Sequence, residues 1–189
     1  MLAVRDGDLA KLGLLFERYH VALFDFLSRM TGDRTAAEDL VQDVFLRILK
    51  YRATYRDGGC FETWVYRIAR NARADYFKKH RAEEPVADEH LECRAPAPGP
   101  AYRLERDREM TRLKRALMAL GEDKRELIVL ARYRDMKHEQ IAELLGIETG
   151  TVKVRIHRAI KELREIFLRL SDENPSCDVK TSTRSLRII

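Results

Sequence analysis

Apolar residues recur at steps of three and four positions through most of the chain, which is the period of an amphipathic α-helix. From Leu9 to about Lys79 the segments LGLLFERYHVALFDFLSRM, AAEDLVQDVFLRIL and FETWVYRIARNARADYFKKH carry this pattern. It returns near Tyr102, in LKRALMALGEDKRELIVLARYRD and HEQIAELLGIETGTVKVRIHRA. No segment has a convincing strand pattern, so the sequence predicts an all-α protein.

Turn residues predict where the first helices end and begin. Gly32 is typical of a helix C-terminus, and Thr35 with Glu38 has the spacing of a capping box that would begin the second helix. The periodicity fails through ATYRDGGC, where Gly58 and Gly59 predict a loop. The third helix is expected to follow that loop.

A change of composition divides the chain into two parts. Residues 82–100 hold four of the five prolines and five acidic residues against one basic residue, a net charge of −4. Such a segment predicts a flexible acidic linker, residues 82–101, between two small helical domains. The domains are then residues 1–81 and 102–170. The polar and aperiodic residues 171–189 predict a disordered tail.

The stretch HEQIAELLGIETGTVKVRIHRA, within the second domain, has the pattern of a helix-turn-helix. Gly146 tolerates a positive φ at the turn, and the small side chain of Ala142 lets the second helix approach at a steep angle. One face of the second helix is apolar: Val152, Ile156, Ala159, Ile160 and Leu163.

The opposite face of that second helix is basic. Between Gly150 and Arg164 there are five basic residues and one acid. A basic helical face alone is usually a solvated one, but here it follows a short turn with the Ala-Gly spacing. The combination favours duplex DNA, where Arg158 could chelate a guanine edge and Val154 could meet a thymine methyl group.

Overall charge and cysteine content limit the other possibilities. The 189 residues carry a net charge of +5, and no apolar run approaches the roughly 20 residues that a membrane-spanning helix needs. We therefore expect a cytoplasmic protein without membrane contact of its own. Cys60, Cys93 and Cys177 are too scattered for a disulfide framework or a zinc site, and His90 with Cys93 would supply half a metal site at most. We expect no metal and no cofactor.

Aromatic and basic residues alternate in TYRDGGCFETWVYRIARNARADYFKKHR of the first domain. Aromatic rings are stacking platforms for unpaired bases, and basic side chains follow the phosphates. The alternative is that Phe61, Trp64 and Ile68 fill a small helical core. The sequence leaves both interpretations open.

Three segments, AEDLVQDVFLRIL, FETWVYRIARN and IAELLGIETGTVKVRIHRA, resemble in order and spacing the motifs of extracytoplasmic-function (ECF) sigma factors of the sigma-70 family. The likeness covers about residues 10–170. It implies a non-catalytic subunit that binds bacterial core RNA polymerase and promoter DNA and directs promoter-specific transcription initiation. Such factors are commonly held inactive by an anti-sigma factor, so that partner is expected as well.

The resemblance also implies residue roles. The first segment would dock on the clamp of the largest polymerase subunit through Asp39, Leu40, Gln42, Asp43 and Phe45. The loop and helix after it would open the minus-ten element and capture a flipped base through Tyr55, Arg56, Gly58, Cys60, Trp64, Arg67, Arg70, Asn71 and Lys78. The helix-turn-helix would read the minus-thirty-five duplex through Thr149, Thr151, Lys153, Val154, Arg155, His157 and Arg158. The acidic linker would thread the nucleic-acid channels of the polymerase.

Some positions depart from the family pattern. Asp135 and Lys137 stand where a glycine and a helix cap are usual, and Val154 stands where a small polar residue is common. Aspartate tolerates left-handed geometry, but lysine cannot cap, so a weaker entry to the helix-turn-helix is expected.

Two other classes of protein remain as alternatives. A stand-alone DNA-binding regulator would bind duplex operator DNA without polymerase. An enzyme, such as a helical hydrolase or nuclease, would need convergent catalytic groups. Asp39 and Asp43 lie one helical turn apart and could resemble a metal pair, but no histidine accompanies them.

Overall fold

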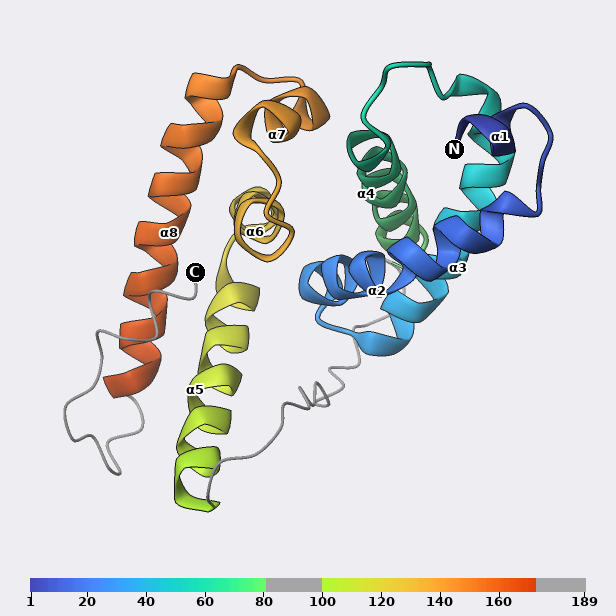
Figure 1. Cartoon of the computed structure of the whole chain (residues 1–189). Coiled ribbons are helices and arrows are strands. Elements are labelled where there is room, and N and C mark those ends of the chain that lie inside the picture. The colour runs from blue at the N-terminus through green and yellow to red at the C-terminus, as the bar shows by residue number, and fades with distance from the viewer. Residues whose placement is uncertain (81–99, 173–189) are drawn as a thin grey trace.

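The computed structural model describes residues 1–80 and 100–172, and these two ranges contain helices and loops but no β-strand (Figure 1). The all-α prediction is confirmed. No helix in these ranges combines the length and apolar character needed to cross a bilayer. The elements are α1 (Leu2–Arg5), α2 (Lys11–Thr31), α3 (Arg34–Tyr51), the 3-10 turn η1 (Arg52–Thr54), α4 (Phe61–His80), α5 (Pro100–Ala119), α6 (Glu122–Ile128), the π-helical turn η2 (Val129–Tyr133), α7 (His138–Leu145) and α8 (Thr149–Asp172).

The predicted linker and tail lie almost wholly outside the described ranges. Their described ends are helical, because α5 already begins at Pro100 and α8 ends only at Asp172. Proline suits the first position of a helix, where its missing N–H group would have no partner inside the helix. The helix of the second domain therefore begins two residues before the predicted boundary.

Helices α2, α3 and α4 pack around a shared apolar core. Phe26 of α2, Ile48 of α3 and Tyr66 of α4 are fully buried, and the rings of Phe26 and Tyr66 meet edge to face. Burying an aliphatic or aromatic side chain of this size stabilises a fold by about 1.5–3 kcal/mol. This core fixes the positions of α3 and α4, and with them the loop that joins the two helices.

The beginning of α3 differs from the prediction. Gly32 ends α2 in the left-handed conformation, as expected, but the N-cap of α3 is Asp33, whose carboxylate accepts a hydrogen bond from the Ala36 N–H group. Thr35 and Glu38 lie inside the first turns with exposed side chains, so the predicted capping box is wrong. The short Asp33 side chain has the extended backbone and the acceptor that a cap requires.

We expect Asp33→Ala to lower the free energy of unfolding by about 1 kcal/mol, because it removes that capping hydrogen bond. Urea denaturation followed by circular dichroism measures the change. Thr35→Ala and Glu38→Ala are matched controls on the same helix, and both should change stability by less than about 0.5 kcal/mol. A larger loss of stability in either control would instead support the capping box of Thr35 and Glu38.

Helices α5 to α8 form the second group, in which α6 continues directly into η2. Its core includes Leu130, Ile141 and Leu163, all buried. The predicted inward face of α8 is confirmed: Val152, Ile156, Ala159 and Leu163 are buried and Ile160 is half-buried. The guanidinium of Arg125 stabilises the α5–α6 turn by donating to the carbonyls of Leu117, Met118 and Leu120.

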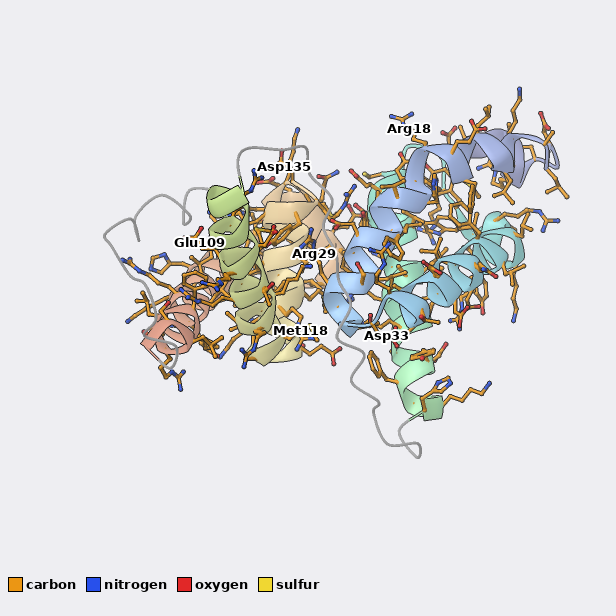
Figure 2. All side chains as sticks on the ribbon, turned by 90° about the horizontal axis from the view of Figure 1, so that it is seen from below. Arg18, Arg29, Asp33, Glu109, Met118 and Asp135 are labelled. Carbon is orange, nitrogen blue, oxygen red and sulfur yellow. The ribbon has the colours of Figure 1, made fainter. Side chains whose placement is uncertain are left out.

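The two groups of helices pack against each other, which the sequence did not predict. Helix α4 contacts α7, and α2 contacts α5, α6 and η2. Figure 2 shows Arg29 of α2 and Met118 of α5 at this boundary. The Arg29 guanidinium lies 3.9 Å from the centre of the Tyr133 ring. A Cβ atom at Gly32 would come within 2.8 Å of the Met118 Cε atom, so α5 approaches the end of α2 closely.

Candidate nucleic-acid and polymerase interfaces

The η1 loop, meaning η1 and residues 55–60 after it, leads into α4. A cavity of about 590 Å³ opens between this loop and the beginning of α4. Its wall includes six residues predicted for minus-ten DNA and six others. The lining is Tyr51, Thr54, Tyr55, Arg56, Gly59, Cys60, Thr63, Trp64, Arg67, Ile68, Asn71 and Glu143.

Tyr55 holds the loop in place beside this cavity. Its hydroxyl donates a hydrogen bond to the Gly59 carbonyl at 2.7 Å, and its ring meets Phe61 and Trp64 edge to face. Burial, followed by nearby Cys60 and Asp57, raises the pKa of the Tyr55 hydroxyl. Because Tyr55 is buried, it supports the loop, whereas Arg56 and Gly58 are exposed on it.

The position of Trp64 is compatible with both interpretations that the sequence left open. The ring is half-buried against Tyr55 and Phe61, and it also lines the cavity. Phe61 is likewise half-buried, whereas Ile68 is a core residue that reaches the cavity wall. Trp64 thus presents an aromatic surface to the cavity, as does the exposed Tyr51.

Cys60 lies just before the first residue of α4, on the cavity wall. Burial acts to raise the pKa of its thiol, but hydrogen bonds from Thr63 and Gln140 outweigh it, so the pKa is lowered. The Gln140 amide of α7 donates to the Cys60 sulfur at 3.2 Å. One edge of the cavity is thus tied to the second domain.

The other predicted minus-ten residues follow α4 toward its C-terminus. Arg67 and Asn71 line the cavity, and Arg70 lies beside it and pairs with Glu126. Lys78 is exposed two helical turns beyond Asn71 and is not part of the cavity wall. The structure therefore brings most of these residues together and leaves Lys78 apart.

The predicted polymerase surface lies on α3, and two of its five residues are misplaced. Asp39 and Gln42 are exposed, and Asp43 is half-buried. Leu40 and Phe45 are only 2% and 7% exposed and belong to the core. They stand on the inward face of the amphipathic helix, so we withdraw them as contact residues.

A smaller cavity of about 260 Å³ lies where α3 meets α4, and Asp39, Asp43 and Arg47 line it. Arg47 donates to Asp43 at 2.9 Å and to Asp75 of α4 at 2.7 Å. Burial works against the charged form of Arg47, but the two carboxylates outweigh it and raise its pKa. Asp43 is thus held by Arg47, whereas Asp39 has no ion pair among the described residues. Within the same ranges no cluster of acidic, histidine and cysteine side chains could hold a metal ion.

Helices α7 and α8 form the predicted helix-turn-helix (Figure 1). Gly146 has a φ of +66°, and the Ile147 N–H group donates to the Ala142 carbonyl across the turn. The predicted outward face of α8 is open: Lys153, Val154, Arg155, His157 and Arg158 are exposed, and Thr149 and Thr151 are half-buried.

The beginning of α7 has the expected backbone geometry at Asp135 and no cap from Lys137, but Gln140 supplies a capping hydrogen bond that was not expected. Asp135 has a positive φ of 53°, and the Lys137 side chain makes no capping hydrogen bond. The Gln140 side chain instead accepts a hydrogen bond from the Lys137 N–H group at 2.9 Å. This bond satisfies one of the free donors at the helix terminus.

Comparison with known families decides what these surfaces belong to. Residues 15–83 match the sigma-70 region 2 model and residues 110–163 match the sigma-70 region 4 model. The chain is 33% identical to RNA polymerase sigma factor CarQ of Myxococcus xanthus, over 89% of this chain and 96% of the relative. It is 32% identical to ECF RNA polymerase sigma factor RpoE of Cereibacter sphaeroides, over 87% of this chain and 91% of the relative.

The chain belongs to the ECF family of RNA polymerase sigma factors. It is a non-catalytic polymerase subunit that directs promoter-specific initiation, so the two alternatives, a stand-alone regulator and an enzyme, are wrong.

Solved structures agree with the fold of this sigma factor. CnrH in complex with the cytosolic domain of CnrY superposes with a TM-score of 0.64 at 25% identity, over 90% of this chain and 94% of that one. RpoE of Bartonella quintana, in complex with the anti-sigma factor NepR, has the same TM-score at 24% identity, over 82% of this chain and 96% of that one.

Some cavity residues of the sigma factor were missing from the prediction. Thr63 lies on the same helical face as Cys60 and Arg67, so the spacing of three and four residues along α4 could have revealed it. Glu143 comes from α7, and no local pattern connects it to a loop some 80 residues earlier in the chain. It depends on the packing of the two domains.

Proposed function

We propose that the two parts of this sigma factor divide promoter recognition. Residues 1–81 bind core polymerase and capture opened minus-ten DNA, and residues 102–170 read the minus-thirty-five element as a duplex, with residues 82–101 as the linker. The observation that carries the proposal is the cavity at the η1 loop, where Trp64 lies beside Arg56, Arg67 and Asn71. An aromatic wall next to basic groups suits an unstacked base and its phosphates.

For the minus-ten strand we propose direct contact by side chains at the cavity and next to it. Tyr55 supports the loop and Gly58 shapes it, since its φ is +78°. Lys78, farther along α4, follows the phosphate backbone. The direct contacts are Arg56, Cys60, Trp64, Arg67, Arg70 and Asn71.

For the duplex element we propose that the outward face of α8 enters the major groove. Arg158 and Val154 meet base edges, and His157 contacts the backbone or a base. The flanking groups meet phosphates, and this set is Thr149, Thr151, Lys153 and Arg155.

For core polymerase we propose contact through Asp39, Gln42 and Asp43 on α3. We further propose that the protein acts in the cytoplasm and is restrained by an anti-sigma factor. The support for that partner is the likeness to RpoE of Bartonella quintana, whose structure was solved with an anti-sigma factor.

We expect Arg158→Ala to reduce transcription from a promoter that depends on its minus-thirty-five element by about tenfold, since a bidentate base contact is worth ~1–3 kcal/mol. Run-off transcription with core polymerase, over a library with randomised elements, measures both the loss and the promoter preference. Core binding should persist.

The matched control is Arg164→Ala, which removes the same charge from an exposed position farther along α8. It should leave the preference unchanged. Equal loss of core binding and of minus-thirty-five dependence in Arg158→Ala would contradict the division of roles.

A further inference from the structure

Acceptor groups of the second domain form hydrogen bonds with two of the arginines that we assign to minus-ten DNA. Arg70 donates through Nε to the Glu126 carboxylate of α6 at 2.7 Å, and through Nη1 to the Leu144 carbonyl of α7 at 3.5 Å. Arg67 donates to the Glu143 carbonyl at 3.3 Å. These are the donors that a phosphate group would otherwise engage.

The acceptors on the second domain together present a negative surface. Glu126 is a carboxylate whose side chain is only 4% exposed, so it points into the contact between the domains. The carbonyls of Glu143 and Leu144 belong to the last turn of α7, which is the negative end of the helix dipole. A carboxylate beside a helix C-terminus resembles the charge and acceptor geometry of a phosphate.

We propose that the packing of the two domains is an autoinhibitory latch, in which Glu126 and the C-terminus of α7 stand in for the minus-ten phosphates at Arg67 and Arg70. Single-stranded DNA and the closed arrangement then compete for the same guanidinium groups. The inference rests on the proposed minus-ten role of α4.

Some buried hydrogen-bond donors in the contact between the two domains have no acceptor in the described part of the chain, and this lowers the free energy needed to separate the domains. Arg73 pairs with Glu122, yet its Nε and Nη1 atoms are buried without a hydrogen-bond partner among the described residues. Burial first, and then the charge of Arg73, lowers the pKa of Arg125. Arg125 also donates across the boundary to the Met30 carbonyl at 2.9 Å. Unpaired buried donors and neighbouring like charges offset the gain from the Arg70–Glu126 pair.

The latch lowers the apparent affinity for DNA without altering the binding surface. When only a fraction of the molecules is open, the apparent dissociation constant rises by the inverse of that fraction. Weakening the latch should therefore strengthen the binding of single strands by the free protein.

The test compares Glu126→Gln with the wild-type full-length chain. Fluorescence anisotropy measures binding of a fluorescein-labelled pool of random single strands about twelve nucleotides long. Small-angle X-ray scattering, without DNA, measures the radius of gyration. We expect Glu126→Gln to increase the radius and to bind the pool about tenfold more tightly, a typical size for coupling between two equilibria.

Three further variants complete the test. Glu162→Gln removes the same charge from the Lys124–Glu162 pair inside the second domain, and it should change neither quantity. Arg70→Ala opens the latch and also removes a proposed DNA contact, so it should bind more weakly than Glu126→Gln, and Glu126→Gln should add nothing in its presence. If Glu126→Gln does not fold, Glu122→Gln replaces it in the test. Glu122 pairs with Arg73 across the same contact between the domains, and its side chain is 66% exposed, so the substitution should be tolerated.

The outcomes separate the latch from the proposed function. An unchanged radius and affinity in folded Glu126→Gln and Glu122→Gln would overturn the latch, as would expansion without tighter binding or an equal gain in Glu162→Gln. If Arg70→Ala binds single strands as tightly as Glu126→Gln, in which the latch is equally open, the minus-ten assignment of α4 itself is wrong, even where the radius shows that the domains open.

Discussion

Asp39→Arg is expected to weaken binding of this sigma factor to core RNA polymerase by more than about 100-fold, because reversing a charge within an interface places like charges together and costs about 3 kcal/mol or more. Asp39 is exposed on α3, and among the described residues no cation pairs with it. Its carboxylate is thus available to a partner. Neighbouring Asp43 is already engaged by Arg47, so its reversal would also disturb the contact between α3 and α4.

The matched control for that variant is Glu17→Arg, the same reversal at an exposed position on α2. Both proteins should unfold thermally like the wild type, because exposed helix positions away from caps and cores change stability by about 0.5 kcal/mol or less. Surface plasmon resonance with immobilised core polymerase gives the dissociation constants. A comparable loss in both variants would indicate a general charge effect and would remove α3 as the docking helix.

Local patterns predicted the parts of this protein that are fixed by local physics. The three- and four-residue periodicity places Val152, Ile156 and Leu163 on the buried face of α8, and Gly146 adopts the left-handed turn that its lack of a side chain permits. The N-cap of α3 was predicted wrongly: the spacing of Thr35 and Glu38 indicated a capping box, but Asp33 has the extended backbone and supplies the acceptor.

The packing of one domain on the other could not be predicted in this way. Arg70 and Glu126 are 56 positions apart, and each alone reads as an ordinary charged residue on a helix surface. The same limit applies to Leu40 and Phe45, which a resemblance to interface motifs marked as contacts although their apolar character suits the core. Motif likeness identifies a surface, but burial decides which of its residues can reach a partner.

The largest energetic effect concerns DNA opening. Stacking in duplex DNA is worth about 1.4 kcal/mol per base-pair step, so separating about ten pairs costs on the order of 14 kcal/mol. Stacking a captured base on an aromatic side chain returns ~1–3 kcal/mol. A base captured at the proposed site beside Trp64 would therefore return too little free energy to maintain a bubble by itself.

We expect the free protein to leave a minus-ten duplex closed and the complex with core polymerase to open it. A 2-aminopurine base within the element reports the change, because its fluorescence rises when it leaves the stack. The matched control is the same DNA with a mismatched minus-ten segment, for which the opening cost is already removed. The free protein should bind this DNA more tightly than the paired duplex, and more tightly still in the Glu126→Gln form. A rise in 2-aminopurine fluorescence on paired DNA without polymerase would contradict the energetic argument, because contacts at α4 would then have to supply most of the cost of strand separation.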